Sequence, residues 1–216
     1  DSSFDGDLLP AISSLRRQLL LTRLVQAFEN EASSADQASR LAAELGRLLD
    51  QVQTQRLSFE DLKKIVPEDY AKHWQVTLTF LEIITKEWPA ILKELGCLDP
   101  ADRRNKLLEN QSRLWRTKPP EGYIIAAGST GSIPATADLL NLVAGLPNGC
   151  VVLPGLDQTM DEGELATLES THPQYQMIQL LSRMSVRVDE VREWRVPGIE
   201  NLLNARANLI NTALRP

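Results

Sequence analysis

The residues best suited to chemistry lie in a loop rich in Gly, Ser and Thr: Gly128, Ser129, Thr130, Gly131 and Ser132. The apolar run Ile124-Ile125-Ala126-Ala127 precedes this loop, and Pro134, a residue suited to the first turn of a helix, follows it. The pattern therefore predicts a strand, a tight loop and a helix. Free backbone N–H groups at such a helix start can hold a phosphate. The loop lacks the Lys-Ser/Thr of a P-loop and a full G-x-G-x-x-G, so a plain α/β connector is the alternative.

Two further polar residues, Asp157 and Gln158, follow a second apolar run at Cys150-Val151-Val152-Leu153. Ligand-binding loops in α/β proteins lie at the carboxyl ends of strands. A carboxylate placed there can hold Mg²⁺ together with phosphate oxygens. The alternative is a side chain that caps its own turn.

One strongly basic run occurs on a helix expected after Asp99-Pro100. It comprises Arg103, Arg104, Lys106, Arg113, Arg116 and Lys118. The run is either a solvated helix face or a surface that contacts nucleic-acid phosphates.

No catalytic constellation is evident in the sequence. The two histidines, His73 and His172, lie in different regions, and neither has a Cys or Asp at metal-ligand spacing. A nucleophile at Ser129 or Ser132 would need a base, and only the distant His172 is available. We therefore predict no catalytic residue and no metal site, and we expect both histidines to be structural.

Composition restricts the classes of function. The chain has 216 residues and a formal net charge of −6, which argues against a dominant nucleic-acid surface but permits a local basic face. Cys97 and Cys150 are expected to be reduced core thiols of a cytosolic protein. No apolar run reaches the ~18 residues of a membrane span, and no signal peptide is visible. Because position 1 is not Met and the last residues continue a helical pattern, we interpret the chain as a fragment.

Residues 1–118 are expected to form an all-helical subdomain. The first predicted helix runs from Pro10 to Asn30, and its apolar stripe is formed by Ile12, Leu15, Leu19, Leu24 and Phe28; the second runs from Ala35 to Gln55 and is capped by Ser34. A short helix is predicted from Ser58, followed by a long helix that begins at Pro67, is interrupted at Pro89 and is ended by Gly96. The last helix of this subdomain is predicted from Pro100 to about 118, with Asp99 as its N-cap. The Pro- and Gly-containing stretch 117–122 marks the join to the second domain.

Residues 119–216 are expected to form an α/β segment. Strands near 123–127 and 150–154, joined by a helix, should pair in parallel, and the unbroken apolar run predicts burial on both faces. An acidic loop follows Asp157, and helices begin near Gln174 and Pro197. Two strands are too few for a stable sheet, so either further strands are missing or the pair packs on helices. The fold class is thus predominantly helical α/β.

Several motifs of the chain are long and specific: Ile125 to Ala137, Val151 to Asp157, His172-Pro173-Gln174-Tyr175, Asp69 to Trp74, and Trp88 to Leu92. Together they resemble one family, AddB of the alphaproteobacterial type. The resemblance covers most of the chain up to about Val191. AddB is a subunit of the AddAB helicase–nuclease, which processes DNA double-strand breaks for homologous recombination.

The resemblance implies an architecture like that of a superfamily 1 helicase without a working motor. Residues 1–118 would correspond to the helical 1B-like subdomain, and 119–216 to part of a P-loop NTPase-like parallel core. Asp157 and Gln158 would be a remnant of the nucleotide sensor. ATP and Mg²⁺ would belong to the motor of the AddA-type partner, and Mg²⁺ with an iron–sulfur cluster to a nuclease domain outside this chain, so no cofactor is expected here.

The expected function is therefore a non-catalytic, helicase-like segment that supports the processing of DNA ends in the cytoplasm, with the nucleoid. Its phosphate contacts would come from Arg103, Arg104, Arg113 and Arg116, or from Ser129, Thr130, Gly131 and Ser132. Two alternatives stay open: a small α/β module that binds a phosphorylated ligand at 128–132, and a protein-interaction scaffold.

Overall fold

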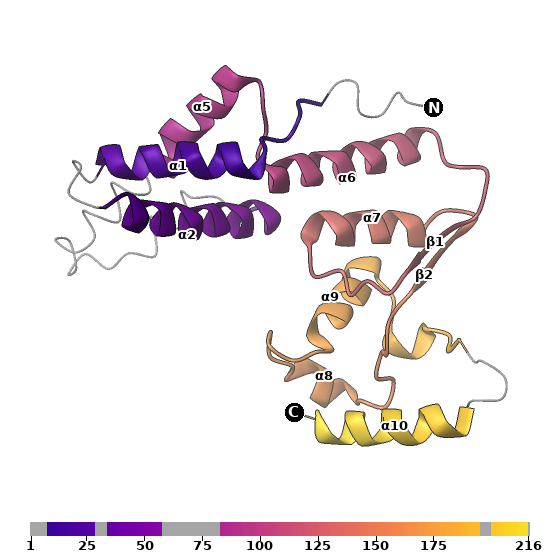
Figure 1. The fold of residues 1–216 in the computed structure, drawn as a ribbon. Helices are drawn as coiled ribbons and strands as arrows, with labels where there is room; N and C mark the ends of the chain where they lie inside the picture. Colours follow the sequence, from indigo (N-terminus) through magenta and orange to yellow (C-terminus); the bar gives the residue numbers. More distant parts are fainter. Residues whose placement is uncertain (1–7, 29–33, 58–82, 195–199, 216) are drawn as a thin grey trace. The chain divides into compact units, whose positions relative to one another are not determined.

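The computed structural model describes residues 8–28, 34–57, 83–194 and 200–215. The chain forms two compact units, residues 1–110 and 111–216, and the division falls within one helix. The described residues are mostly helical and contain one two-stranded parallel sheet (Figure 1). This confirms the expected predominantly helical α/β class.

The first unit is built on two helices, α1 (Ser14–Phe28) and α2 (Ala35–Thr54), which lie along each other (Figure 1). Ser34 begins α2 with a capping box: its hydroxyl accepts from Gln37 N, and the Gln37 side chain accepts from Ser34 N. Reciprocal bonds of this kind satisfy backbone donors that a helix start leaves unpaired. The predicted N-cap at Ser34 is therefore confirmed.

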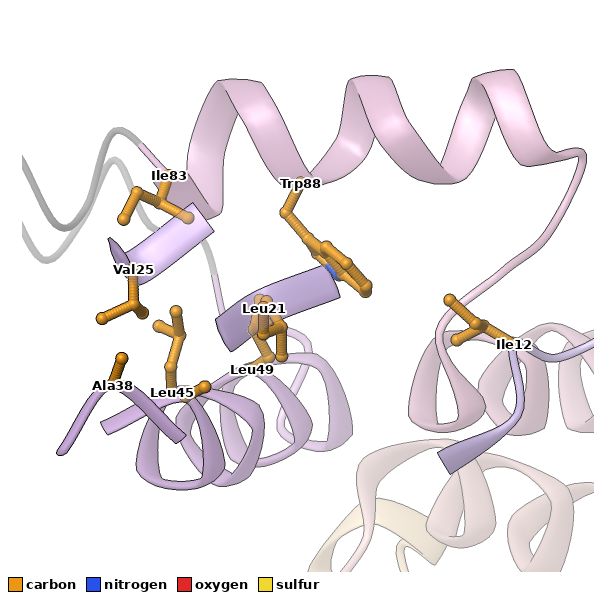
Figure 2. Close-up of a cluster of buried hydrophobic side chains, with 9 residues drawn as sticks. Ile12, Leu21, Val25, Ala38, Leu45, Leu49, Ile83 and Trp88 are labelled. Atoms are coloured by element: carbon orange, nitrogen blue, oxygen red, sulfur yellow. The ribbon is translucent and has the colours of Figure 1, made fainter. Parts of the chain in front are cut away.

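A cluster of buried apolar side chains joins these helices to the segment that follows residue 82 (Figure 2). Its members are Ile12, Leu21, Val25, Ala38, Ala42, Leu45, Leu49, Ile83 and Trp88. The predicted stripe of α1 is wrong at Leu15 and Leu19, which are 69% and 56% exposed. The buried face carries Arg17, Leu21 and Val25 instead.

The first predicted helix also begins too early. Pro10 does not open a helix, because its carbonyl accepts from Leu98 N and the neighbouring Ile12 N donates to Leu98 O, both at 2.9 Å. This short parallel bridge holds residues 10–12 in an extended conformation, so α1 begins only at Ser14.

A π-helix (Ile83–Glu87) leads into α5 (Trp88–Leu95), with Pro89 in the first turn of α5. The change of helix type at this point agrees with the predicted interruption. Gly96 ends α5 with φ +60°, as predicted. The predictions for the short helix from Ser58 and for the long helix from Pro67, including His73, lie outside the described residues.

A buried polar cluster centres on Asp99, which is 1% exposed. Its Oδ2 accepts from Trp88 Nε1 and Gln53 Nε2, both at 2.8 Å, and its Oδ1 lies 2.9 Å from Arg17 Nε as an ion pair. Helix α6 (Pro100–Thr117) begins at Pro100 as expected. The Asp99 carboxylate, however, is directed to these three side chains and not to the helix start.

The second unit contains β1 (Ile124–Ala127), α7 (Pro134–Ala144) and β2 (Gly149–Val152). The strands pair in parallel, with Ile125 opposite Cys150 and Ala126 opposite Val151. Both predicted strands and the parallel pairing are therefore confirmed, as is Pro134 in the first turn of α7.

The expectation that β1 is covered on both faces is wrong. Ala126 and Val151 pack against a small core made by α7 and α9 (Tyr175–Met184), whereas Ile125 is 62% exposed and Cys150 is exposed. Among the described residues the sheet has only two strands, and these helices cover one face. Cys150 is accordingly not a core thiol, while Cys97 is half-buried against the first core.

The remaining elements are short. Asp161 and Glu164 form a capping box that begins α8 (Glu162–Ala166), where the sequence predicted an acidic loop. After α9, which was predicted, come a 3₁₀ turn (Val188–Glu190) and α10 (Glu200–Ala213). The predicted start of the last helix at Pro197 lies outside the described residues.

Candidate functional site

The loop between β1 and α7 depends on two glycines in the left-handed region. Gly128 has φ +77° and Gly131 has φ +69°, conformations that other residues rarely adopt. At Gly131 an added Cβ would also lie 3.0–3.2 Å from the Leu180 side chain of α9. The loop is thus packed closely against α9 at Gly131.

The polar groups of this loop have partly internal partners. Ser129 Oγ accepts from Gly131 N at 3.3 Å, while Ser132 is exposed and Thr130 is half-buried. The N-cap of α7 is Ile133, which provides no side-chain hydrogen bond to the helix start. The first backbone N–H groups of α7 therefore have no side-chain cap, a condition that suits an anion.

Sequence reasoning missed a cationic side chain beside this helix start. Arg183 of α9 donates to Pro134 O at 3.3 Å and to Asp138 Oδ1 at 2.7 Å. Only the tertiary packing of α9 on α7 reveals this, because Arg183 lies 49 residues from Pro134 and 45 from Asp138 in the sequence. The Asp138 carboxylate partly neutralises the charge of Arg183.

The loop after β2 is organised by Asp157, which is 1% exposed. Its Oδ1 accepts from Thr159 N at 2.9 Å and from Thr159 Oγ1 at 2.7 Å. Gln174 braces the same loop, since its Oε1 accepts from Asp157 N and its Nε2 donates to Gly155 O. This geometry is that of a carboxylate that caps its own turn, the alternative weighed from the sequence.

Gln158 lies beside Asp157 in sequence but has different partners. Its Nε2 donates to Val188 O at 3.1 Å and to Val191 O at 2.6 Å. The amide thereby fastens the 3₁₀ turn to the loop after β2. The structure therefore directs the two predicted sensor residues to separate internal contacts.

The four predicted arginines of α6 fall into two pairs. Arg103 and Arg104 belong to the first unit, where Arg103 Nε donates to Leu9 O at 3.2 Å and Arg104 donates to Thr54 Oγ1 at 2.7 Å. Arg113 and Arg116 belong to the second unit, and their side chains are exposed.

Arg113 and Arg116 also share one side of α6. At 3.6 residues per turn, they lie about 60° apart around the helix axis, whereas Arg104 is about 180° from Arg113. Within the described part of the chain, neither Arg113 nor Arg116 forms an ion pair. Both side chains are exposed, and the four arginines do not form one continuous face.

His172 and Ser129, which were weighed as a hydrolytic pair, have separate partners. His172 Nδ1 accepts from Gln174 N at 3.1 Å, and its Nε2 lies 2.5 Å from Leu214 O, so Nε2 carries the proton. Ser129 is bonded within its own loop. His172 anchors its own loop, in agreement with the structural role predicted for it.

In the described residues no group of three or more His, Cys, Asp or Glu side chains is arranged to hold a metal ion. No described helix is long and apolar enough to cross a membrane. Comparisons of the chain with protein-family models, with curated proteins and with solved structures gave no match. The resemblance to AddB therefore rests on the sequence motifs alone.

Proposed function

We propose that the chain is a non-catalytic, helicase-like segment of an AddB-type subunit that supports the processing of DNA double-strand breaks. In this role, Arg113 and Arg116 contact phosphates of the DNA. The partners are DNA ends and an AddA-type helicase–nuclease subunit in the cytoplasm. The observation that carries the DNA contact is the exposed arginine pair on one side of α6, without an ion-pair partner among the described residues.

The internal contacts of Asp157 and Gln158 support the non-catalytic part of the proposal. A nucleotide sensor must present its carboxylate or amide to the γ-phosphate and its Mg²⁺. Here Oδ1 of Asp157 is taken by Thr159, and the Gln158 amide is taken by two backbone carbonyls. A parallel strand–helix–strand unit is compatible with part of a P-loop-type core.

The test compares two charge reversals on the same helix. A fluorescein-labelled duplex with a forked end is titrated with the wild-type chain, with Arg113→Glu/Arg116→Glu and with the matched control Arg103→Glu/Arg104→Glu. We expect the first variant to weaken binding on the order of tenfold or more, because two phosphate contacts become repulsive. The control should bind like wild type, because its arginines are directed to Leu9 and Thr54. Equal effects of the two variants would contradict the assignment.

A second function has one specific observation in its favour. The uncapped start of α7 favours a small phosphorylated ligand at the loop formed by Ser129, Thr130, Gly131 and Ser132. Titration with inorganic phosphate, followed by backbone amide NMR, should then selectively shift the amide signals of residues 128–133 and 135–136, since Pro134 has no amide N–H. Uniform small shifts over the whole chain would remove this alternative.

A further inference from the structure

The open face of the β1–β2 pair begins with an exposed aromatic residue. Tyr123, immediately before β1, is 85% exposed, and Ile125 is 62% exposed. Because side chains alternate along a strand, Tyr123, Ile125 and Ala127 are directed to the same side. Cys150, the partner of Ile125 on β2, is exposed as well. These four residues form an apolar strip on the face that α7 and α9 leave open.

Cations precede this strip closely in sequence. Residues 111–125 contain Arg113, Arg116 and Lys118 against a single acid, Glu121, so their formal charge is +3 − 1 = +2, whereas the whole chain carries −6. All three cationic side chains are exposed. The five residue steps from Lys118 to Tyr123 span at most about 18 Å even when the chain is fully extended. A ligand of a few linked units can therefore reach both the cations and the strip.

An exposed aromatic ring that closely follows a run of cations in the sequence matches one kind of polymer best. Single-stranded nucleic acid presents flat base faces and a negative charge at each step, and proteins bind it through aromatic stacking platforms with basic tracks. Inside a duplex the base faces are stacked on one another, so the ring of Tyr123 would find a base face to stack against only at a duplex end.

We propose that the strip of Tyr123, Ile125, Ala127 and Cys150 is a stacking platform that gives the chain a preference for single-stranded over duplex DNA. Bases stack on Tyr123 while Arg113, Arg116 and Lys118 hold the adjacent phosphates. The proposal rests on the proposed function, since two of these cations are the same DNA contacts. It adds a site on the open face of β1 and β2, with Tyr123 at the amino end of β1, whereas the loop of residues 128–132 follows the carboxyl end of that strand.

The test uses the whole chain with two probes, a fluorescein-labelled oligothymidylate of about 20 nucleotides and a duplex of equal length. The wild type should bind the oligothymidylate more tightly. Tyr123→Ala should weaken binding to the single strand by roughly 5- to 100-fold and leave duplex binding within about twofold, whereas Tyr123→Phe should retain the preference. Trp194→Ala is the matched control, because Trp194 is a second exposed aromatic of the same unit, at 70% exposure. It should bind both probes like wild type.

The outcomes separate this inference from the proposed function. If Arg113→Glu/Arg116→Glu abolishes binding but Tyr123→Ala does not alter the strand preference, the platform is overturned and the phosphate contact stands. If Tyr123→Ala removes the preference while the arginine variant binds normally, the platform stands and the proposed phosphate contact fails. If the wild-type chain binds neither the oligothymidylate nor the duplex, both the stacking platform and the proposed phosphate contact are overturned. Binding of poly-glutamate as tightly as oligothymidylate, insensitive to Tyr123→Ala, would mean that the surface takes any polyanionic chain and would also overturn the platform.

Discussion

Replacing Asp99 by Ala should destabilise the first unit strongly. The carboxylate is 1% exposed and serves three side chains at once: it accepts from Trp88 Nε1 and Gln53 Nε2 at 2.8 Å and lies 2.9 Å from Arg17 Nε. Truncation leaves a buried indole N–H without an acceptor and a buried guanidinium without one of its counter-ions. Both effects are among the few that make single substitutions severely destabilising.

The magnitude follows from these contacts. Breaking a buried ion pair by removing one partner costs about 3–5 kcal/mol, and an orphaned buried donor costs about 1–3 kcal/mol. Arg17 keeps two other contacts, Asp50 at 2.9 Å and Gly46 O at 3.2 Å, which reduces the first value. Because the two effects share one site they do not add fully. We therefore expect a loss of about 3–5 kcal/mol in the free energy of unfolding.

Urea unfolding followed by tryptophan fluorescence and far-ultraviolet circular dichroism measures this loss. The matched control is Asp102→Ala, one turn away in α6, where the carboxylate forms a half-buried i,i+4 ion pair with Lys106 at 2.8 Å. Pairs of that kind contribute about 0.3–0.5 kcal/mol. If the Asp99→Ala variant were as stable as the Asp102→Ala variant, the view that Asp99 organises this unit would be refuted.

Two glycine substitutions test the second unit. Gly149→Ala should destabilise it by about 3 kcal/mol or more, because the added Cβ would lie 1.8 Å from Val143 O. The control is Gly122→Ala, whose added Cβ would have no atom within 4 Å, so this variant should change thermal unfolding little. Gly131→Ala combines a strained φ of +69° with a Cβ 3.0 Å from Leu180, and we expect a loss of about 1–3 kcal/mol. A melting temperature for either variant equal to that of Gly122→Ala would contradict the corresponding geometry.

The elements of the second unit were largely predictable because their signals are local. The apolar runs around Ile125 and Val151 predicted strands, and Pro134 predicted the helix start between them. Exposure was not predictable in the same way. An unbroken apolar run is typical of a strand buried on both faces, and only the three-dimensional arrangement leaves Ile125 and Cys150 open to solvent.

Helix α1 shows a related limit. Leu15 and Leu19 have the same i,i+4 spacing as Arg17 and Leu21, so periodicity alone favours the leucine pair as the buried face. Burial of Arg17 becomes favourable only because Asp99, far away in sequence, lies beside it. An ion pair between residues so far apart in the sequence cannot be predicted from a local sequence pattern.

The candidate site was predictable in residue type but not in grouping. The basic run predicted which arginines could contact phosphates, but not which of them lie on the same side of the helix. Helical geometry and the contact of Arg104 with Thr54 separate Arg104 from Arg113 and Arg116, which share one side of α6. The contacts of Asp157 with Thr159 follow a turn motif that the sequence left as one of two alternatives. Arg183 near the start of α7 had no sequence signal, since its position depends on how α9 packs.

The most direct test of the central claim is the salt dependence of duplex binding, measured by fluorescence anisotropy over several salt concentrations. Each phosphate neutralised by the protein contributes about −0.9 to the slope of log K against log salt concentration. We predict a negative slope for the wild-type chain that becomes shallower by about 2 in the neutral variant Arg113→Gln/Arg116→Gln, as two lost contacts require. A wild-type chain that does not bind even at low salt, or a slope unchanged by that variant, would contradict the claim that these arginines contact DNA.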